Sequence, residues 1–208
     1  MVPTLLVVIV ILVVLVAAYF GLYRPWQLHW GATADEIAAA LPGDEIVPEP
    51  SFNATRAVTI QAPPAGIFPW IVQIGINRAG WYSYDLLDNL GRKSAEELLP
   101  QFQNPQAGDL VPMSPDGRRG IWVKAFERDR WMLWWDRTGA TSWVWVIVPQ
   151  EGLTSRLITR VRMKYRWLPW AAPFNVLVEF FDLPMMRKSL LGIKRRAEAL
   201  TTASWPKN

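Results

Sequence analysis

One short stretch, NRAGWYSYDLLDNLG at residues 77–91, concentrates the side chains of this chain that could do chemistry. Tyr82, Tyr84 and Asp85 place two hydroxyls and a carboxylate close together, and Gly80 before them permits a sharp backbone turn. If burial raised the pKa of Asp85, its carboxylate would serve as a general base while a tyrosine hydroxyl polarised a substrate oxygen. Catalysis is therefore one hypothesis for this stretch.

Two other hypotheses fit the same residues. Tyr82, Tyr84 and Asp85 could hold the polar end of a ligand, or Asp85 and Asn89 could brace the turn while the aromatic rings close a core. Arg56 and Arg78 lie beside apolar stretches, where either could pair with Asp85 or bind an anionic head group. The choice depends on the elements that position the stretch.

Composition excludes several kinds of site. The 208 residues include no cysteine and one histidine, His29, which follows the first apolar segment. A thiol nucleophile and a thiolate metal site are therefore excluded, and neither a multi-histidine metal site nor a Ser-His-Asp triad is expected in the folded domain. We expect no metal and no other cofactor.

The N-terminal segment predicts a membrane anchor. Residues 5–20 read LLVVIVILVVLVAAYF, and the flanking apolar residues extend this run to the roughly 20 residues that cross a hydrocarbon core. Tyr19, Tyr23, Trp26 and Trp30 follow as an aromatic belt. We predict one transmembrane helix over residues 1–23.

The charges beside this segment bear on cleavage and orientation. No Lys or Arg precedes the apolar run, whereas a secretory signal peptide normally has one there, so an anchor is favoured over a cleaved leader. Cleavage near residues 16–18, VAA, is the alternative. The first basic residue, Arg24, follows the span, which favours a cytoplasmic location for the rest of the chain.

Residues 24–53 are predicted to form a juxtamembrane collar, followed by a domain over residues 54–202. TADE at 33–36 is a capping box that opens a short helix through Leu41, and residues 42–50 then run extended between prolines. SAEE at 94–97 is a second capping box and predicts another helix start.

Apolar periodicity predicts the remaining elements. A strand over 56–61 precedes a helix in which Ile67, Trp70, Ile71 and Ile74 share one face. Period-two patterns and short turns then predict an antiparallel meander. Its strands cover about 108–113, 120–127, 130–136, 141–149 and 154–166. A final helix is predicted from about Pro184, which completes an α+β order of strand, helices, five strands and helix.

Positive charge gathers in the second half of the chain. Residues 118–208 hold 17 Lys/Arg and 7 Asp/Glu, whereas residues 1–117 hold 5 and 11. In the last strand, period two predicts a solvent face with Arg160, Arg162, Lys164 and Arg166, which would attract anionic lipid if it faced the membrane. No nucleic-acid-binding motif is present, so nucleic acid is not an expected partner.

The element order and several motifs resemble one protein superfamily. WGATADE, LPGDEIVPEP, RAVTIQAPPAGIFPWIVQIG, RAGWYSYDLLDN, AGDLVPM and LLGIKRRAE, in this order, are similar to membrane-anchored bacterial proteins of the SRPBCC superfamily, also called START-like, which includes polyketide cyclases and lipid-transfer domains. The resemblance covers residues 30–200. It implies a helix-grip fold, in which an antiparallel sheet wraps on a long C-terminal helix around an apolar cavity. It does not imply one chemistry.

By this analogy the 77–91 stretch lies at the cavity mouth. Thirteen tryptophans supply bulky walls, and the alternative is a filled aromatic core without a cavity. The candidate ligand-binding residues are Trp70, Arg78, Trp81, Tyr82, Tyr84, Asp85, Trp143, Trp145 and Met163.

The function that the sequence favours is membrane-tethered binding of a hydrophobic ligand, a lipid or an isoprenoid-like molecule. One alternative is a cyclase- or hydrolase-type enzyme that uses Asp85 with Tyr82 or Tyr84. The other is a structural, partner-binding membrane protein with a filled core.

Overall fold

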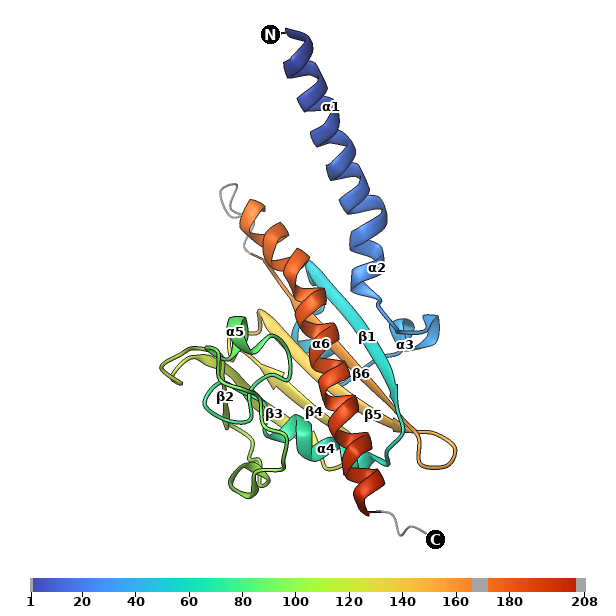
Figure 1. Ribbon diagram of the computed structural model, residues 1–208, viewed down its shortest axis with the longest axis vertical. Helices are drawn as coiled ribbons and strands as arrows, with labels where there is room; N and C mark the ends of the chain where they lie inside the picture. Colours follow the sequence, from blue (N-terminus) through green and yellow to red (C-terminus); the bar gives the residue numbers. More distant parts are fainter. Residues whose placement is uncertain (1, 166–171, 205–208) are drawn as a thin grey trace.

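The computed structural model describes residues 2–165 and 172–204. At its centre lies one antiparallel sheet of six strands in the order β1-β6-β5-β4-β3-β2. A long helix, α6 (Ala172–Ser204), runs across one face of this sheet (Figure 1). The strands are β1 (Phe52–Ile60), β2 (Leu110–Pro112), β3 (Gly120–Glu127), β4 (Trp131–Trp135), β5 (Thr141–Pro149) and β6 (Ser155–Met163).

This architecture confirms the predicted α+β helix-grip fold. The meander from β2 to β6 follows the predicted order, and α4 (Pro64–Val72) is the predicted helix after the first strand. That strand is longer than predicted and begins at Phe52, because the register with β6 pairs Phe52 with Met163 and Ala54 with Val161. The core lies between the sheet, α4 and α6.

The chain begins with a helical rod that projects from the domain (Figure 1). The rod consists of α1 (Val2–Ala18), a π-helical turn (Tyr19–Tyr23) and α2 (Arg24–Leu28). Residues 4–28 are long and apolar enough to cross a membrane. The hydrogen bonds between the rod and α6 begin at Tyr19, whose hydroxyl lies 3.5 Å from the Val176 carbonyl oxygen.

The helix α6 begins twelve residues before the predicted start at Pro184, so that prediction was wrong. A proline inside a helix leaves the carbonyl four residues earlier without its usual N–H partner. Here that carbonyl belongs to Phe180, and the Tyr23 hydroxyl donates to it at 3.1 Å. The helix therefore passes through Pro184 because the N-terminal rod replaces the missing donor.

The collar contains α3 (Ala34–Ala38) and a 3₁₀ turn (Asp44–Ile46). The Thr33 capping box is confirmed: Thr33 Oγ1 accepts from the Glu36 N–H at 3.2 Å, and the Glu36 carboxylate accepts from the Thr33 N–H at 2.8 Å. We predicted that residues 42–50 run extended. This prediction was wrong for part of the segment, because Gly43 turns the chain at φ 89°.

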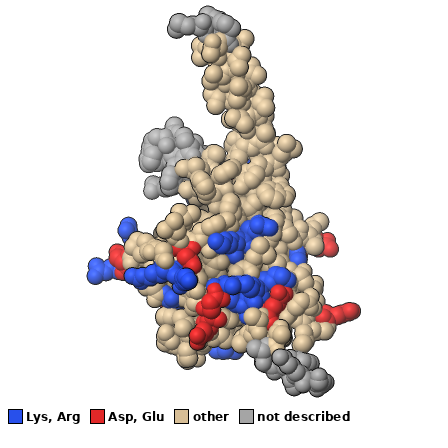
Figure 2. Space-filling view, viewed as in Figure 1, with Lys and Arg blue, Asp and Glu red and all other residues tan. Residues whose placement is uncertain are grey.

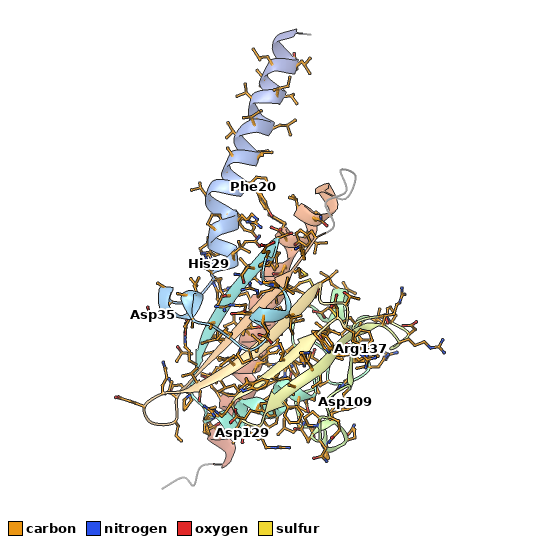
Figure 3. All side chains as sticks on the ribbon, turned by 180° about the vertical axis from the view of Figure 1, so that it is seen from behind. Phe20, His29, Asp35, Asp109, Asp129 and Arg137 are labelled. Carbon is orange, nitrogen blue, oxygen red and sulfur yellow. The ribbon has the colours of Figure 1, made fainter. Side chains whose placement is uncertain are left out.

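The collar covers the sheet on the face opposite α6. Seen from behind, Asp35 of α3 marks the collar, just beyond His29 at the base of the rod (Figure 3). Gly43 lies directly against the Leu133 side chain of β4, which is buried although its neighbours Met132 and Trp134 face the main core. Both faces of the sheet are therefore covered.

This cover corrects the predicted solvent-exposed basic face of β6. Arg160 is only 3% exposed, and all five of its N–H groups are donated. Its acceptors are Thr55 Oγ1, the Asp44 carboxylate and the backbone carbonyls of Glu36, Ile37 and Ala39, at 2.7–2.9 Å. The last three close the C-terminal end of α3, whose carbonyls have no partners within the helix.

The neighbouring cations are also engaged by the collar. Arg156 pairs with Glu36 at 2.6 Å, and Arg162 donates to the carbonyls of Val47 and Pro48 at 3.0 and 3.1 Å. Among the predicted cations that the structure describes, only Lys164 remains exposed, at 60%. Arg166 lies outside the described residues. The period-two pattern gave the correct face but carried no information about the collar that covers it.

The second predicted capping box does not open a helix, and residues 94–97 are irregular. The Ser94 hydroxyl accepts instead from the Tyr82 N–H at 3.1 Å and donates to Asp85 at 2.6 Å. Glu96 pairs with Arg195 and Arg196 of α6. Tertiary partners have taken the groups that would have capped a helix.

A close contact fixes α6 against the 77–91 stretch at Gly192. A Cβ at this position would lie 2.4 Å from the Tyr82 carbonyl oxygen and 2.8 Å from Tyr82 Cβ. We expect Gly192→Ala to lower the free energy of unfolding by about 1–3 kcal/mol, the usual cost of overpacking, although glycine to alanine in an open helix stabilises by about 1 kcal/mol. Denaturant unfolding of the full chain in micelles measures this.

The control is Gly66→Ala in α4, where the nearest atom to an added Cβ is Thr201 Oγ1 at 3.4 Å. This variant should be as stable as the parent chain or slightly more stable. A Gly192→Ala variant that unfolds together with Gly66→Ala would show that α6 and the Tyr82 backbone are not in tight contact.

Candidate ligand-binding cavity

A cavity of about 540 Å³ lies between α6, the 77–91 stretch and the sheet. Its volume falls within the range of pockets that hold small-molecule ligands. Most of its lining is apolar, from Ile76, Trp81, Leu87, Leu90, Met113, Pro115, Trp143, Leu177, Val178, Phe181, Met185 and Met186. Its polar lining residues are Ser83, Asp88, Asp182 and Ser189.

Two tryptophans form one wall of the cavity. The rings of Trp81 and Trp143 stack with centroids 5.8 Å apart and an interplanar angle of 13°. The Trp143 N–H is satisfied because it donates to Thr159 Oγ1 at 2.8 Å. Trp143 also contacts Trp145 and Trp134, which are fully buried. The tryptophan-rich strands therefore build both a filled core and, at one end of it, a cavity wall.

The 77–91 stretch is a tightly held turn. Gly75 and Gly80 exchange two backbone hydrogen bonds of 3.1 Å, and Gly80 has the positive φ of 79° that glycine adopts without strain. Tyr82 also has a positive φ, 57°, which a bulky side chain rarely adopts. Hydrogen bonds hold it there: its N–H donates to Ser94 and its hydroxyl to the Trp70 carbonyl.

The structure does not bring the proposed catalytic groups together. The Tyr82 hydroxyl is bonded to Gln73 and Trp70, and burial raises the pKa of Tyr82. Asp85 begins α5 (Asp85–Asp88) and accepts from Ser94. Tyr84 is 40% exposed, with the Lys188 ammonium 3.8 Å from its ring centroid. No hydrogen bond among the described residues joins Asp85 to either tyrosine, and these contacts are those of a braced turn.

Of the nine candidate ligand-binding residues, Trp81 and Trp143 line the cavity. Trp70 packs edge-on against Tyr82, with ring centroids 6.0 Å apart, and Trp145 lies in the filled core. Met163 is a partly buried residue at the end of β6.

Neither candidate arginine lines the cavity. Arg78 donates to the carbonyls of Val72 and Leu110. Arg56 is buried beneath α6, donates to the Gln27 carbonyl and pairs with Asp182 at 2.5 Å. The expected pairing of Arg56 or Arg78 with Asp85 is not present, because both guanidinium groups have other partners.

The sequence matches no protein-family model and no curated protein. Among solved structures, the chain is similar to the Polyketide_cyc-like protein Cgl2372 from Corynebacterium glutamicum, at 14% identity and a TM-score of 0.44 over 75% of this chain and 97% of that one. It is also similar to TTHA0849 from Thermus thermophilus, at 15% identity and a TM-score of 0.40 over 74% and 99%.

The strand order, the antiparallel pairing and the helix gripped by the sheet agree with the predicted superfamily layout. The fold is an α+β helix-grip fold. The 540 Å³ cavity of this chain lies between the C-terminal helix and the sheet.

One polar residue of the cavity was not among the candidates named from the sequence. Asp88 ends α5 and lines the cavity, and neither of its carboxylate oxygens, both buried, is engaged by a hydrogen bond of good geometry among the described residues. The nearby Ser83 hydroxyl donates to the Met185 carbonyl at 3.0 Å. The spacing of Asp85 and Asp88 in DLLD gave no sign of which carboxylate faces the cavity.

Burial raises the pKa of Asp88, and Asp85 on the same turn adds to the rise, while Ser83 and the Tyr84 backbone oppose it. At a pH below about 4, the pKa of an aspartate in an unfolded chain, Asp88 is protonated in both the folded and the unfolded state. As pH rises from there through the raised folded-state pKa, the wild type loses stability relative to a neutral variant. Asp88→Asn should therefore be more stable than the parent at pH 7 and equal to it in acid.

Thermal unfolding of the full chain across pH measures this difference. The control is Asp85→Asn on the same turn, which weakens the bond from Ser94 and is expected to gain no stability at neutral pH. A pH-independent offset between Asp88→Asn and the parent would contradict the burial of the carboxylate.

An apolar rim surrounds the cavity mouth. Six exposed residues of the cavity lining form it: Leu87, Leu90, Met113, Leu177, Val178 and Phe181. Leu177 and Phe181 lie on the turns of α6 that the rod contacts through Val176 and Phe180. Charged side chains gather on the lower part of the molecule in Figure 2, whereas the described surface of the rod is almost free of them.

Proposed function

We propose that this protein is a membrane-tethered binding protein for a hydrophobic ligand, a lipid or an isoprenoid-like molecule. The observation that carries the proposal is the apolar cavity of about 540 Å³, whose mouth residues Leu177 and Phe181 lie on the part of α6 bound to the base of the apolar rod. An exposed apolar patch of this kind is typical of a lipid-facing or ligand-binding surface.

The contacts between the rod and α6 support access from a bilayer. Tyr and Trp side chains concentrate at the level of the lipid head groups, and Tyr19, Tyr23 and Trp26 form such a belt at the end of the apolar run. Tyr19 and Tyr23 are hydrogen-bonded to the first turns of α6, which supports a position of these turns at the same level. A ligand that leaves the bilayer there would meet the rim before it meets water.

The proposal predicts a bound lipid on the purified protein. The full chain is extracted from membranes in a mild detergent, exchanged until free lipid is removed, and measured by native mass spectrometry. We expect an apolar molecule at near one per chain, identified after extraction. A chain that carries no such mass, and takes none up from a total lipid extract, would overturn the proposal.

A further inference from the structure

The polar groups of the cavity differ in how well they are satisfied. The Ser83 hydroxyl donates to Met185, and the Asp182 carboxylate is paired with the buried Arg56. Asp88 is less well satisfied: Ser83 and the backbone of Tyr84 lie near its carboxylate and oppose the rise of its pKa, but its two oxygens are buried and accept no hydrogen bond of good geometry among the described residues. A buried acceptor in this state costs free energy unless something supplies a donor.

The charge of the lining is one-sided. Among the residues that the structure describes, Asp88 and Asp182 are the charged ones of the lining, and none of the others is Lys, Arg or His. Arg56 neutralises Asp182, which leaves Asp88 as the uncompensated charge of the cavity. Lys188, on the adjacent part of α6, lies over the Tyr84 ring and does not line the cavity. A carboxylate or phosphate head group would therefore meet repulsion at Asp88 and no cation.

We infer that the ligand is an amphiphile whose polar end donates hydrogen bonds to Asp88, either a hydroxyl or an ammonium group, and that anionic lipids are disfavoured. This inference rests on the proposed ligand-binding function and deepens it. Asp88 acts as the acceptor that orients the head group, while Trp81, Trp143 and the methionines of α6 enclose the apolar body.

The inference differs from the sequence-based hypothesis of an anionic head group bound by Arg56 or Arg78. Both guanidinium groups are held by the protein, through Asp182 and Gln27 for Arg56 and through two backbone carbonyls for Arg78, although Arg56 Nη2 and Arg78 Nε have no hydrogen bond among the described residues. Neither lines the cavity.

The test uses the full chain in phosphatidylcholine nanodiscs and three alkyl probes of matched chain length, an amine, an alcohol and a carboxylic acid. Each carries a bromine at the far end of the chain, and the corresponding brominated alkane is the fourth probe. Bromine quenches nearby tryptophans, and Trp81 and Trp143 line the cavity. Quenching in a Trp81→Phe/Trp143→Phe variant gives the background from the membrane and from the other tryptophans.

We expect the amine and the alcohol to bind about tenfold more tightly than the acid, the difference that one charge-assisted hydrogen bond supplies. In Asp88→Asn the preference for the amine over the acid should fall to about twofold or less. The matched variant Asp85→Asn, on the same turn but with its carboxylate bonded to Ser94, should keep the wild-type preference.

The outcomes separate this inference from the function on which it rests. If the alkane and all three amphiphiles bind with similar affinity, or the acid binds best, the head-group inference is wrong and the cavity still binds apolar molecules. If Asp88→Asn keeps the full preference, Asp88 is not the acceptor. If no probe quenches above the background variant, the proposed ligand-binding function itself fails.

Discussion

Replacing Ser189 with phenylalanine is expected to abolish ligand retention while the chain remains folded. Ser189 lines the cavity from α6, so a phenylalanine ring there occupies space that a ligand needs. Because the ring enters a cavity of about 540 Å³ and not a packed core, the usual cost of overpacking, about 1–3 kcal/mol, should be largely avoided. The lipid mass that we expect on the parent chain in native mass spectrometry should fall by at least about tenfold, since a lost 1.4 kcal/mol already has that effect.

Two controls separate blocking from other effects of the substitution. Ser189→Ala removes the hydroxyl without filling space and should keep most of the lipid. Thr202→Phe adds the same ring to an exposed position near the end of α6, outside the cavity, and should keep all of it. If Ser189→Phe carries as much lipid as Thr202→Phe, the lipid is bound elsewhere on the protein.

Replacing Arg160 with methionine is expected to cause the largest loss of stability among these variants, about 3–5 kcal/mol, as when one partner is removed from a buried ion pair. The substitution leaves Asp44 without its shortest ion pair and leaves the carbonyls at the end of α3 without donors. Lysine at this position should rescue little, because it lacks the planar guanidinium that donates five bonds. Denaturant unfolding of the full chain measures the loss.

Lys164→Met is the matched control. Lys164 lies four residues after Arg160 and one residue beyond the end of β6, so alternation puts its side chain on the same face, but it is 60% exposed and lies 3.8 Å from Glu49. An exposed pair of this kind contributes at most about 1 kcal/mol. Limited proteolysis should also cut the collar faster in Arg160→Met than in Lys164→Met. Equal stability of the two variants would show that the collar does not depend on Arg160.

The contrast between Arg160 and Lys164 also shows how far the sequence predicts this structure. Alternation along β6 gave the strand, its register of faces and the fold class, because these depend on local periodicity. The environment of the second face depends on residues more than a hundred positions earlier, which no local pattern encodes. Arg160 therefore looked like a solvated cation although it closes the end of α3.

The start of α6 and the carboxylate residue that lines the cavity were missed for related reasons. Pro184 is a sound helix-breaking signal, and it failed because the Tyr23 hydroxyl bonds the Phe180 carbonyl from a distant part of the chain. The 77–91 stretch was correctly identified as a turn with Gly80 at a positive φ. Which of Asp85 and Asp88 faces the cavity depends on Ser94, which engages Asp85 and leaves Asp88 to the cavity wall.

The hydrogen bond between Tyr23 and Phe180 also limits how far the domain can move relative to the rod. Together with the ion pair of Arg24 and Glu179 at 2.8 Å, it joins the rod to the helix that forms the cavity wall, so the domain swings on the rod only if these contacts break. A protein that takes up a ligand at one membrane and releases it at another requires a flexible tether. If the rod anchors the chain as proposed, the cavity would stay beside the membrane, and a ligand that leaves it for the aqueous side would pass to an acceptor that comes to the domain.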